Sequence, residues 1–159
     1  MKIITGTVLG IIKDNRILLI KRNKYPFIGL WSLLGGKLEY SEHIDECALR
    51  EAKEETSLDH AFKRYCGVIS EQIITNGELS DQFLLFLCHL EPEHTNHIES
   101  EEGELKWFDL EDLEEIKDSM VPSDYHIINN MLLNDNHGMF ISVIKNEDGK
   151  YTQERFDKV

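Results

Sequence analysis

Three glutamates near the middle of the chain are spaced so that they could share one chemical task. Glu51, Glu54 and Glu55 stand at positions i, i+3 and i+4, so a helix would project their carboxylates from one face. Like charges at this spacing repel each other by about 0.2–0.5 kcal/mol per pair on an exposed helix. Such a face suits either full contact with water or the binding of hard cations, because magnesium takes carboxylate, water and phosphate oxygens as ligands. Taken alone, the glutamates leave both interpretations open.

The residues around these glutamates follow a longer pattern of fixed positions. Gly36 is followed by five residues and Glu42, and then by seven residues and the run REAKEETSL at positions 50–58. This spacing resembles the signature of the Nudix hydrolase family, and six of the family's polar or glycine positions are kept over 23 residues. Ser57 is a departure, because it stands where the family has Gly and must adopt a left-handed conformation at some cost.

The resemblance implies a magnesium-dependent hydrolase, with manganese as the alternative metal, and it assigns roles within this pattern. The implied metal-site residues are Glu51, Glu54, Glu55, Gly36 and Glu42. The implied catalytic residues are Glu54, Glu55, Arg50 and Glu51. Arg50 would orient a neighbouring glutamate, since the partner of a metal ligand holds that ligand in place; an ordinary surface salt bridge is the alternative. Gly36 would let the metal and the phosphates approach the backbone closely.

Hydrolysis also needs a carboxylate that accepts a proton from the attacking water. Glu54 or Glu55 could serve, and so could an acidic residue of the polar segment around positions 91–104. The candidates in that segment are Glu99, Glu101, Glu102 and Glu104. Taken one at a time, each of them is more simply explained as a solvated loop charge. The sequence contains neither an HExxH nor a GxSxG motif, so it does not indicate a zinc site or a covalent serine mechanism.

The tract from Pro122 to Tyr125 bears on the substrate. It resembles the segment in which the oxidised-purine nucleoside triphosphatases of this family carry a Pro-Asp-Asp sequence that reads the purine edge. Asp124 keeps the second acid of that segment, and Ser32 stands where that subgroup has a base-contacting Asn. Asp124 could equally be a helix N-terminal acid, worth about 0.3–1 kcal/mol through the helix dipole. Lys37 and Glu39 are further candidates for substrate binding, through phosphate and metal respectively, although both could be loop surface.

By this resemblance, the expected reaction is cleavage of the pyrophosphate bond of a nucleoside triphosphate to a nucleoside monophosphate and pyrophosphate. An oxidised purine nucleotide such as 8-oxo-dGTP is one candidate substrate. A second expectation, within the same chemistry, is hydrolysis of ADP-ribose, a nucleotide sugar or a dinucleoside polyphosphate. A third is a Nudix domain that binds a nucleotide without cleaving it, and the intact Arg50 and glutamates argue against this. The sequence does not identify the base or the leaving group.

The elements that must position these residues follow from hydrophobic periodicity and turn signals. A helix is expected from about residue 42 to 56, with Ser41 as its N-cap. Strands are expected at 3–12, 17–20, 62–74, 82–90, 105–108, 139–144 and 151–156. A small helix capped by Asp109 and helical periodicity from 122 to 133 complete the pattern. These elements indicate a mixed sheet packed by helices, and the resemblance implies the α+β Nudix fold, an α/β/α sandwich.

Length and composition favour one domain over residues 1–159, because a chain of this size with 41% hydrophobic residues can bury a core without disulfides or metals. The formal net charge of -13 repels nucleic-acid polymers and anionic membranes. A small nucleotide remains a plausible partner if divalent cations lie between it and the protein, because a bound metal reverses the local electrostatics.

The cysteines and the apolar runs bear on the compartment. Cys47, Cys66 and Cys88 form no CxxC pair, so we expect buried thiols in a reducing environment. The apolar opening at 3–12 has no small-residue cleavage site, and no run approaches the roughly 18 residues of a membrane-spanning helix. A soluble, cytoplasmic protein is therefore expected, with a homodimer left open.

Overall fold

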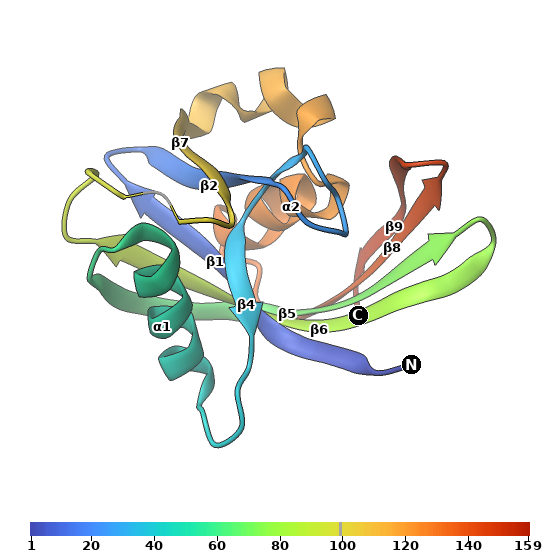
Figure 1. Cartoon of the computed structure of the whole chain (residues 1–159), viewed down its shortest axis with the longest axis horizontal. Coiled ribbons are helices and arrows are strands. Elements are labelled where there is room, and N and C mark those ends of the chain that lie inside the picture. The colour runs from blue at the N-terminus through green and yellow to red at the C-terminus, as the bar shows by residue number, and fades with distance from the viewer. Residues whose placement is uncertain (99) are drawn as a thin grey trace.

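A curled mixed β-sheet forms the body of the molecule (Figure 1). The computed structural model of the chain describes residues 1–98 and 100–159. The strands are β1 (Ile3–Lys13), β2 (Arg16–Arg22), β3 (Trp31–Ser32), β4 (Leu34–Lys37), β5 (His60–Thr75), β6 (Glu78–Pro92), β7 (Gly103–Asp109), β8 (Met139–Glu147) and β9 (Lys150–Lys158). The helical elements are α1 (Ile44–Thr56), the 3-10 helix η1 (Leu110–Ser119), α2 (Pro122–Ile127) and the π-helix η2 (Ile128–Leu132).

Strand β1 joins the two parts of the sheet. Its last residues pair antiparallel with β2, where Ile12 lies opposite Ile17. Its middle pairs antiparallel with β4 on one edge and parallel with β6 on the other. The sheet continues from β6 through β5 and β8 to β9, while β2 also pairs with β3 and β7. Because a short loop leads from β4 into α1, this arrangement places the start of α1 close to β1.

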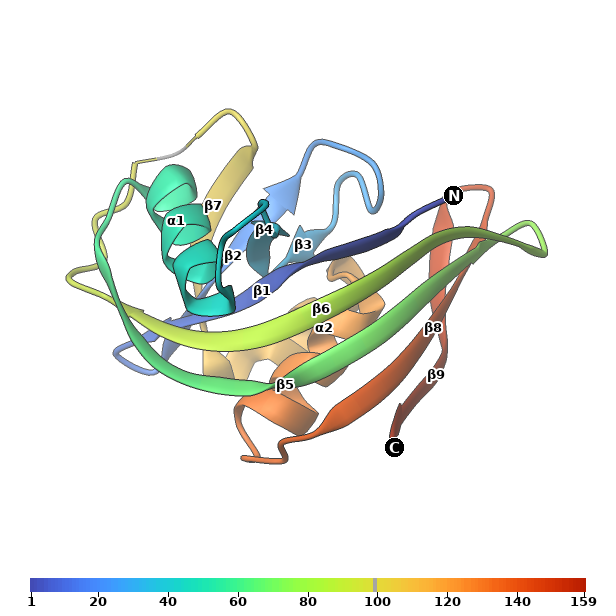
Figure 2. The same cartoon turned by 90° about the horizontal axis from the view of Figure 1, so that it is seen from below.

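Helices pack on both faces of the sheet (Figure 2). The alternation of side chains along β2 shows this, since Leu18 packs in one core cluster and Leu19 in the other. The first cluster contains Ala48 and Ala52 of α1, and the second contains Ile127 of α2. The predicted mixed sheet packed between helices is confirmed.

Helix α1 begins later than the sequence suggested, and the prediction of Ser41 as its N-cap was wrong. His43 occupies the N-cap position, with φ -83° and ψ 163°, while Ser41 has a φ of 66° in the preceding turn. The His43 amide donates to the Glu46 carboxylate at 3.1 Å, which is half of a capping box. Glu42 lies outside the helix because its carboxylate accepts the amide of Glu39 at 2.9 Å and also contacts Arg50.

The other expected elements are present, with strands longer than predicted. β5 and β6 extend to a tight turn at Asn76 and Gly77, both of which have positive φ. The helical tract at 122–133 divides into α2 and η2. At the end of α1, Ser57 adopts the left-handed conformation that its place in the pattern requires, with φ 62°. In the described part of the chain, no helix has the length and apolar character needed to cross a membrane.

The predicted burial of the cysteines gives a test of the core. Cys47, Cys66 and Cys88 are free and buried, and burial raises the pKa of each thiol, that of Cys88 to about 12. Because the thiolate is the reactive form, the native protein should react slowly with Ellman's reagent at neutral pH. All of the thiols should react once guanidinium unfolds the chain, and the absorbance of the released thionitrobenzoate measures both states. Rapid labelling of the folded protein would contradict this packing.

Candidate active site

The glycine pair that precedes the glutamates lies where β4 is pressed between β1 and α1. A Cβ atom on Gly35 would lie 2.0 Å from the carbonyl oxygen of Thr7 on β1. A Cβ atom on Gly36 would lie 2.1 Å from the carboxyl carbon of Glu51 on α1. Both positions therefore require glycine because of close approach. The backbone of β4 is consequently in direct contact with the glutamates of the helix.

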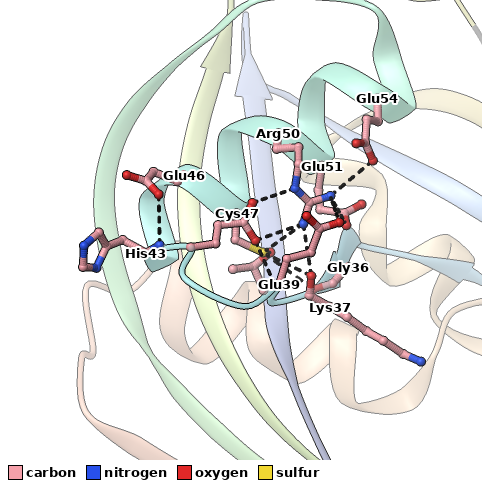
Figure 3. A network of polar contacts seen from close by, with 11 residues as sticks. Gly36, Lys37, Glu39, His43, Glu46, Cys47, Arg50, Glu51 and Glu54 are labelled. Atoms are coloured by element: carbon pink, nitrogen blue, oxygen red, sulfur yellow. Dashed lines mark hydrogen bonds and ion pairs between the residues drawn. The ribbon is translucent and has the colours of Figure 1, made fainter.

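The guanidinium of Arg50 lies at the centre of a cluster of carboxylates (Figure 3). Its Nε and Nη2 atoms donate to the Glu42 carboxylate at 2.6 and 3.1 Å. Its Nη1 atom donates to Glu51 at 2.9 Å and to Glu54 at 3.3 Å, and it lies 3.7 Å from Glu39. Hydrogen bonds from Arg50 lower the pKa of Glu42 to about 2. Arg50 thus fixes the orientation of several carboxylates at once.

The glutamates that share one face of α1 differ in depth. The side chain of Glu54 is 58% exposed, whereas that of Glu51 is 12% exposed. Burial raises the pKa of Glu51, and the hydrogen bond from Arg50 acts against this. Glu55 is buried, and its Oε2 atom accepts the backbone amide of Gly35 at 3.3 Å. The face predicted from the sequence is therefore a row of carboxylates that runs from solvent into the protein.

A loop glutamate completes the inner end of this row. Burial raises the pKa of Glu55 to about 10, and the next causes are a hydrogen bond with Glu102 and the charge of that residue. Glu102 is thus the loop candidate that the fold brings to the cluster. Glu104 instead pairs with Lys21 within the sheet, the backbone of Glu101 accepts a hydrogen bond from Asn23, and Glu99 lies outside the described residues.

These residues suit a hard divalent cation. Within residues 1–98 and 100–159, no group of His, Cys, Asp or Glu side chains is already arranged to enclose a metal ion. Magnesium, however, needs only one or two protein carboxylates, because water and substrate phosphates complete its shell. Glu102 is exposed, but it lies beside the buried Glu55, and the two negative charges repel each other. A cation beside them would remove that repulsion, and their donor chemistry is all oxygen.

A cavity of about 370 Å³ opens next to this cluster. One part of its wall contains Gly36, Lys37 and Glu102, and another contains Ser32 and Asp124. A smaller hollow of about 70 Å³, lined by Gly35, Glu55 and Glu102 among others, shares wall residues with it. The sequence candidates Lys37, Ser32 and Asp124 therefore meet in one cavity. Glu39 does not line this cavity; its side chain is 67% exposed and faces Arg50.

Asp124 belongs to the interior of the cavity. It is only 7% exposed, and its Oδ2 atom accepts the backbone amide of Leu33 at 2.9 Å. That amide lies in the break between β3 and β4. Burial raises the pKa of Asp124 to about 7, and the negative charge of Glu71 is the second cause. Asp124 thus lies in the first turn of α2, as the helix-end alternative has it, and it is also a buried acid with a backbone partner across the cavity wall.

Sequence reasoning missed Glu71. This residue of β5 is 3% exposed and lines the same cavity as Asp124. Its neighbours at two-residue spacing, Ile69 and Ile73, are fully buried, so all three side chains point to the same face of the strand. The available signal was an ionisable residue on the apolar face of an expected strand. Burying a charge costs free energy unless the charge is paired or hydrogen-bonded, so such a residue stands out.

Fold and site together place a row of helical glutamates, bound by one arginine, beside a cavity of about 370 Å³. The chain belongs to the Nudix family, since the NUDIX domain model matches residues 4–131. Within that family it is a MutT-like Nudix hydrolase.

Individual relatives support this assignment. The chain is 30% identical over 107 residues to the oxidized purine nucleoside triphosphate hydrolase of Mus musculus, over 67% of each chain. It is 52% identical over 62 residues to the ADP-ribose pyrophosphatase of Methanocaldococcus jannaschii, which covers 38% of this chain and 37% of that protein. The crystal structure of a MutT protein from Bacillus halodurans superposes with a TM-score of 0.75 at 22% identity, over 98% and 97% of the two chains. That structure shows the shared fold.

The two glycines should respond differently to the same substitution. Gly36→Ala forces the Glu51 carboxylate to move, so turnover should fall by at least tenfold, while a flexible side-chain end absorbs the clash and stability changes little. Gly35→Ala pushes against the backbone of Thr7 on β1 and should cost roughly 1–3 kcal/mol of stability, as overpacking does. Urea unfolding and steady-state kinetics on both variants test this. Equal losses of stability in the two would contradict the packing described.

Proposed function

We propose that the chain is a magnesium-dependent pyrophosphohydrolase of purine nucleoside triphosphates, oxidised purines included, that releases a nucleoside monophosphate and pyrophosphate. One observation carries this proposal. The same cavity has Gly36 and Glu102, which adjoin the glutamates of α1, at one part of its wall and the buried polar side chain of Asp124 at another. Its volume of about 370 Å³ lies within the range of about 300–1,000 Å³ that is usual for ligand sites. A nucleotide can therefore contact both regions at once.

The metal and the residues of the cluster would have separate roles in the reaction. Bound magnesium would stabilise the negative charge of the leaving pyrophosphate. Glu51, Glu54 and Glu55 would hold it, with Arg50 keeping Glu51 and Glu54 in orientation. Glu102, which lines the cavity, is the carboxylate best placed to accept the proton of the attacking water.

The phosphate chain would be bound by residues of β4. Gly36 leaves space beside Glu51, so the phosphates and the metal can approach the backbone. Lys37 lines the cavity, and Figure 3 shows its side chain extending away from the Arg50 cluster. Its ammonium group is therefore free of the carboxylates drawn there and would pair with a phosphate oxygen.

One relative supports the choice of a triphosphate as the proposed substrate. The match to the oxidized purine nucleoside triphosphate hydrolase extends over two thirds of both chains. A purine triphosphate is also consistent with the buried position of Asp124, the residue that the sequence resemblance linked to purine recognition. ADP-ribose is the second candidate, because a local stretch is 52% identical to an ADP-ribose pyrophosphatase.

Activity should require magnesium or manganese and the glutamates of α1. Glu54→Gln and Glu55→Gln should each lower kcat by at least about a hundredfold, the low end for removing a group that acts in the transition state. Asp45→Asn is the matched control, because it removes an exposed acid from the first turn of the same helix and should keep kcat within about twofold. Steady-state assays of pyrophosphate release, with and without EDTA, provide the measurement. Full turnover in excess EDTA would sink the metal mechanism.

The cut should fall between the α and β phosphorus atoms. Cleavage there leaves pyrophosphate, whose charge a bound magnesium ion stabilises well. Phosphorus NMR of a digest of dGTP, dATP and 8-oxo-dGTP, with ADP-ribose in parallel, identifies the products. Nucleoside monophosphate and pyrophosphate are expected. Nucleoside diphosphate with orthophosphate as the primary products would refute the assignment, and faster cleavage of ADP-ribose would favour the second candidate.

A further inference from the structure

Glu71 is a buried acid of the cavity to which the proposed reaction gives no task. It is 3% exposed and lines the cavity with Asp124. The Oγ atom of Ser142 donates to its Oε1 atom at 3.0 Å. Burial raises the pKa of Glu71, and the hydroxyl groups of Ser123 and Ser142 act in the opposite direction. This carboxyl group faces the cavity on one side and a hydroxyl donor on the other.

The C-terminal hairpin, β8 with β9, holds Glu71 in place. Glu71 and Ser142 lie directly opposite each other in the parallel pairing of β5 with β8. On β9, the Nε2 atom of Gln153 donates to the Oγ atom of Ser142 at 2.9 Å. The Ser142 hydroxyl therefore accepts from Gln153 and keeps its own hydrogen for Glu71. This chain of contacts holds the Glu71 carboxyl group in place through its Oε1 atom.

The same hairpin also supports the opposite wall of the cavity. The ring of Tyr151 on β9 lies 4.6 Å from the ring of Phe27, centroid to centroid, and Phe27 lines the cavity. The Tyr151 hydroxyl accepts the backbone amide of Phe27 at 3.3 Å. The hairpin at 139–158 lies beyond the residues 4–131 that the family model matches.

Two carboxyl groups that line one cavity hold a proton between them more readily than two negative charges. After burial, the negative charge of Glu71 is the next cause of the raised pKa of Asp124, so the two groups are coupled. Asp124 also accepts the backbone amide of Leu33, and Glu71 accepts the Ser142 hydroxyl. The pair therefore presents one donor and one acceptor to the cavity.

We propose that Glu71 is a specificity-determining residue that reads the edge of a guanine-type base together with Asp124. One acid of the pair donates the shared proton to the 6-oxo group, and the other accepts from the ring N–H and the 2-amino group. This rests on the proposed function, since it places the base of the nucleotide in this part of the cavity. A guanine-type edge satisfies the donor and the anionic acceptor together. An adenine edge offers one N–H group fewer to the acceptor, so it leaves part of a buried acceptor unpaired, which disfavours binding.

The test compares variants of Glu71 on two nucleotides. Glu71→Leu removes the polar partner, and Glu71→Gln restores a hydrogen-bonding group through its amide while keeping an oxygen for Ser142. Ser142→Ala removes the positioning contact alone. Gln72→Leu is the matched control, because it makes the same kind of change on the adjacent residue of β5, which points to the other face of the strand. The ratio of kcat/KM for dGTP to that for dATP is measured for each protein with magnesium, alongside thermal unfolding.

Glu71→Leu should lower the dGTP to dATP ratio at least tenfold, through KM, and Ser142→Ala should lower it several-fold. Glu71→Gln and Gln72→Leu should keep it within about threefold. Calorimetric binding of dGMP and dAMP without metal repeats the comparison independently of turnover. If Glu71→Leu does not fold, the ratio for Ser142→Ala decides.

The outcomes separate this inference from the proposed function. Hydrolysis of triphosphates with an unchanged ratio in Glu71→Leu and Ser142→Ala would overturn the role of Glu71 and leave the proposed function standing. Absence of hydrolysis, with dGMP binding that prefers dGMP over dAMP and is lost in Glu71→Leu, would overturn the proposed function and support the inference. Equal binding of dGMP and dAMP by the unmodified protein would overturn the inference.

Discussion

The contact between the Arg50 guanidinium and the carboxylates around it is the interaction on which the site depends. Two carboxylates 4 Å apart repel by roughly 4 kcal/mol at an effective dielectric of about 20, so a crowded acidic face needs a cation to keep its geometry. Arg50 also donates to the carbonyl of Lys37 at 3.1 Å, which ties α1 to the end of β4. Because Arg50 binds Glu42, that residue stays outside the helix, and α1 begins only at Ile44.

Much of the fold could be predicted because its signals are local. The hairpin of β5 and β6 has Asn76 and Gly77 where positive φ is needed, and helix α1 has its apolar residues and glutamates at helical spacing. The start of α1 was predicted wrongly because it depends on a contact between residues that are not adjacent in the sequence. Ser41 is a good N-cap by residue type, but the pairing of Glu42 with Arg50, eight residues further along, leaves the N-cap position to His43.

The site divides in the same way. The glutamates of α1 and the glycine pair lie within one stretch of sequence, so their spacing predicted that they would meet. Glu102 and Glu71 could not be selected in that manner, because each reaches the cavity from a distant strand or loop whose path depends on the curl of the whole sheet. Asp124 was suggested by a short tract, and its contact with Leu33, 91 positions away in the chain, is a product of tertiary packing alone.

The break between β3 and β4 joins two regions of the cavity through the backbone. The amide of Leu33 donates to Asp124, and the amide of Gly35, two residues later, donates to Glu55. Two residues of extended chain span about 7 Å, and pairing of β4 with β1 holds Gly35 and the residues after it rigid. The strand therefore fixes the distance between Asp124 and the glutamate cluster. The site therefore selects a ligand by the distance between its base and its phosphates. A ligand with the right groups at the wrong spacing can contact either Asp124 or the glutamate cluster, but not both.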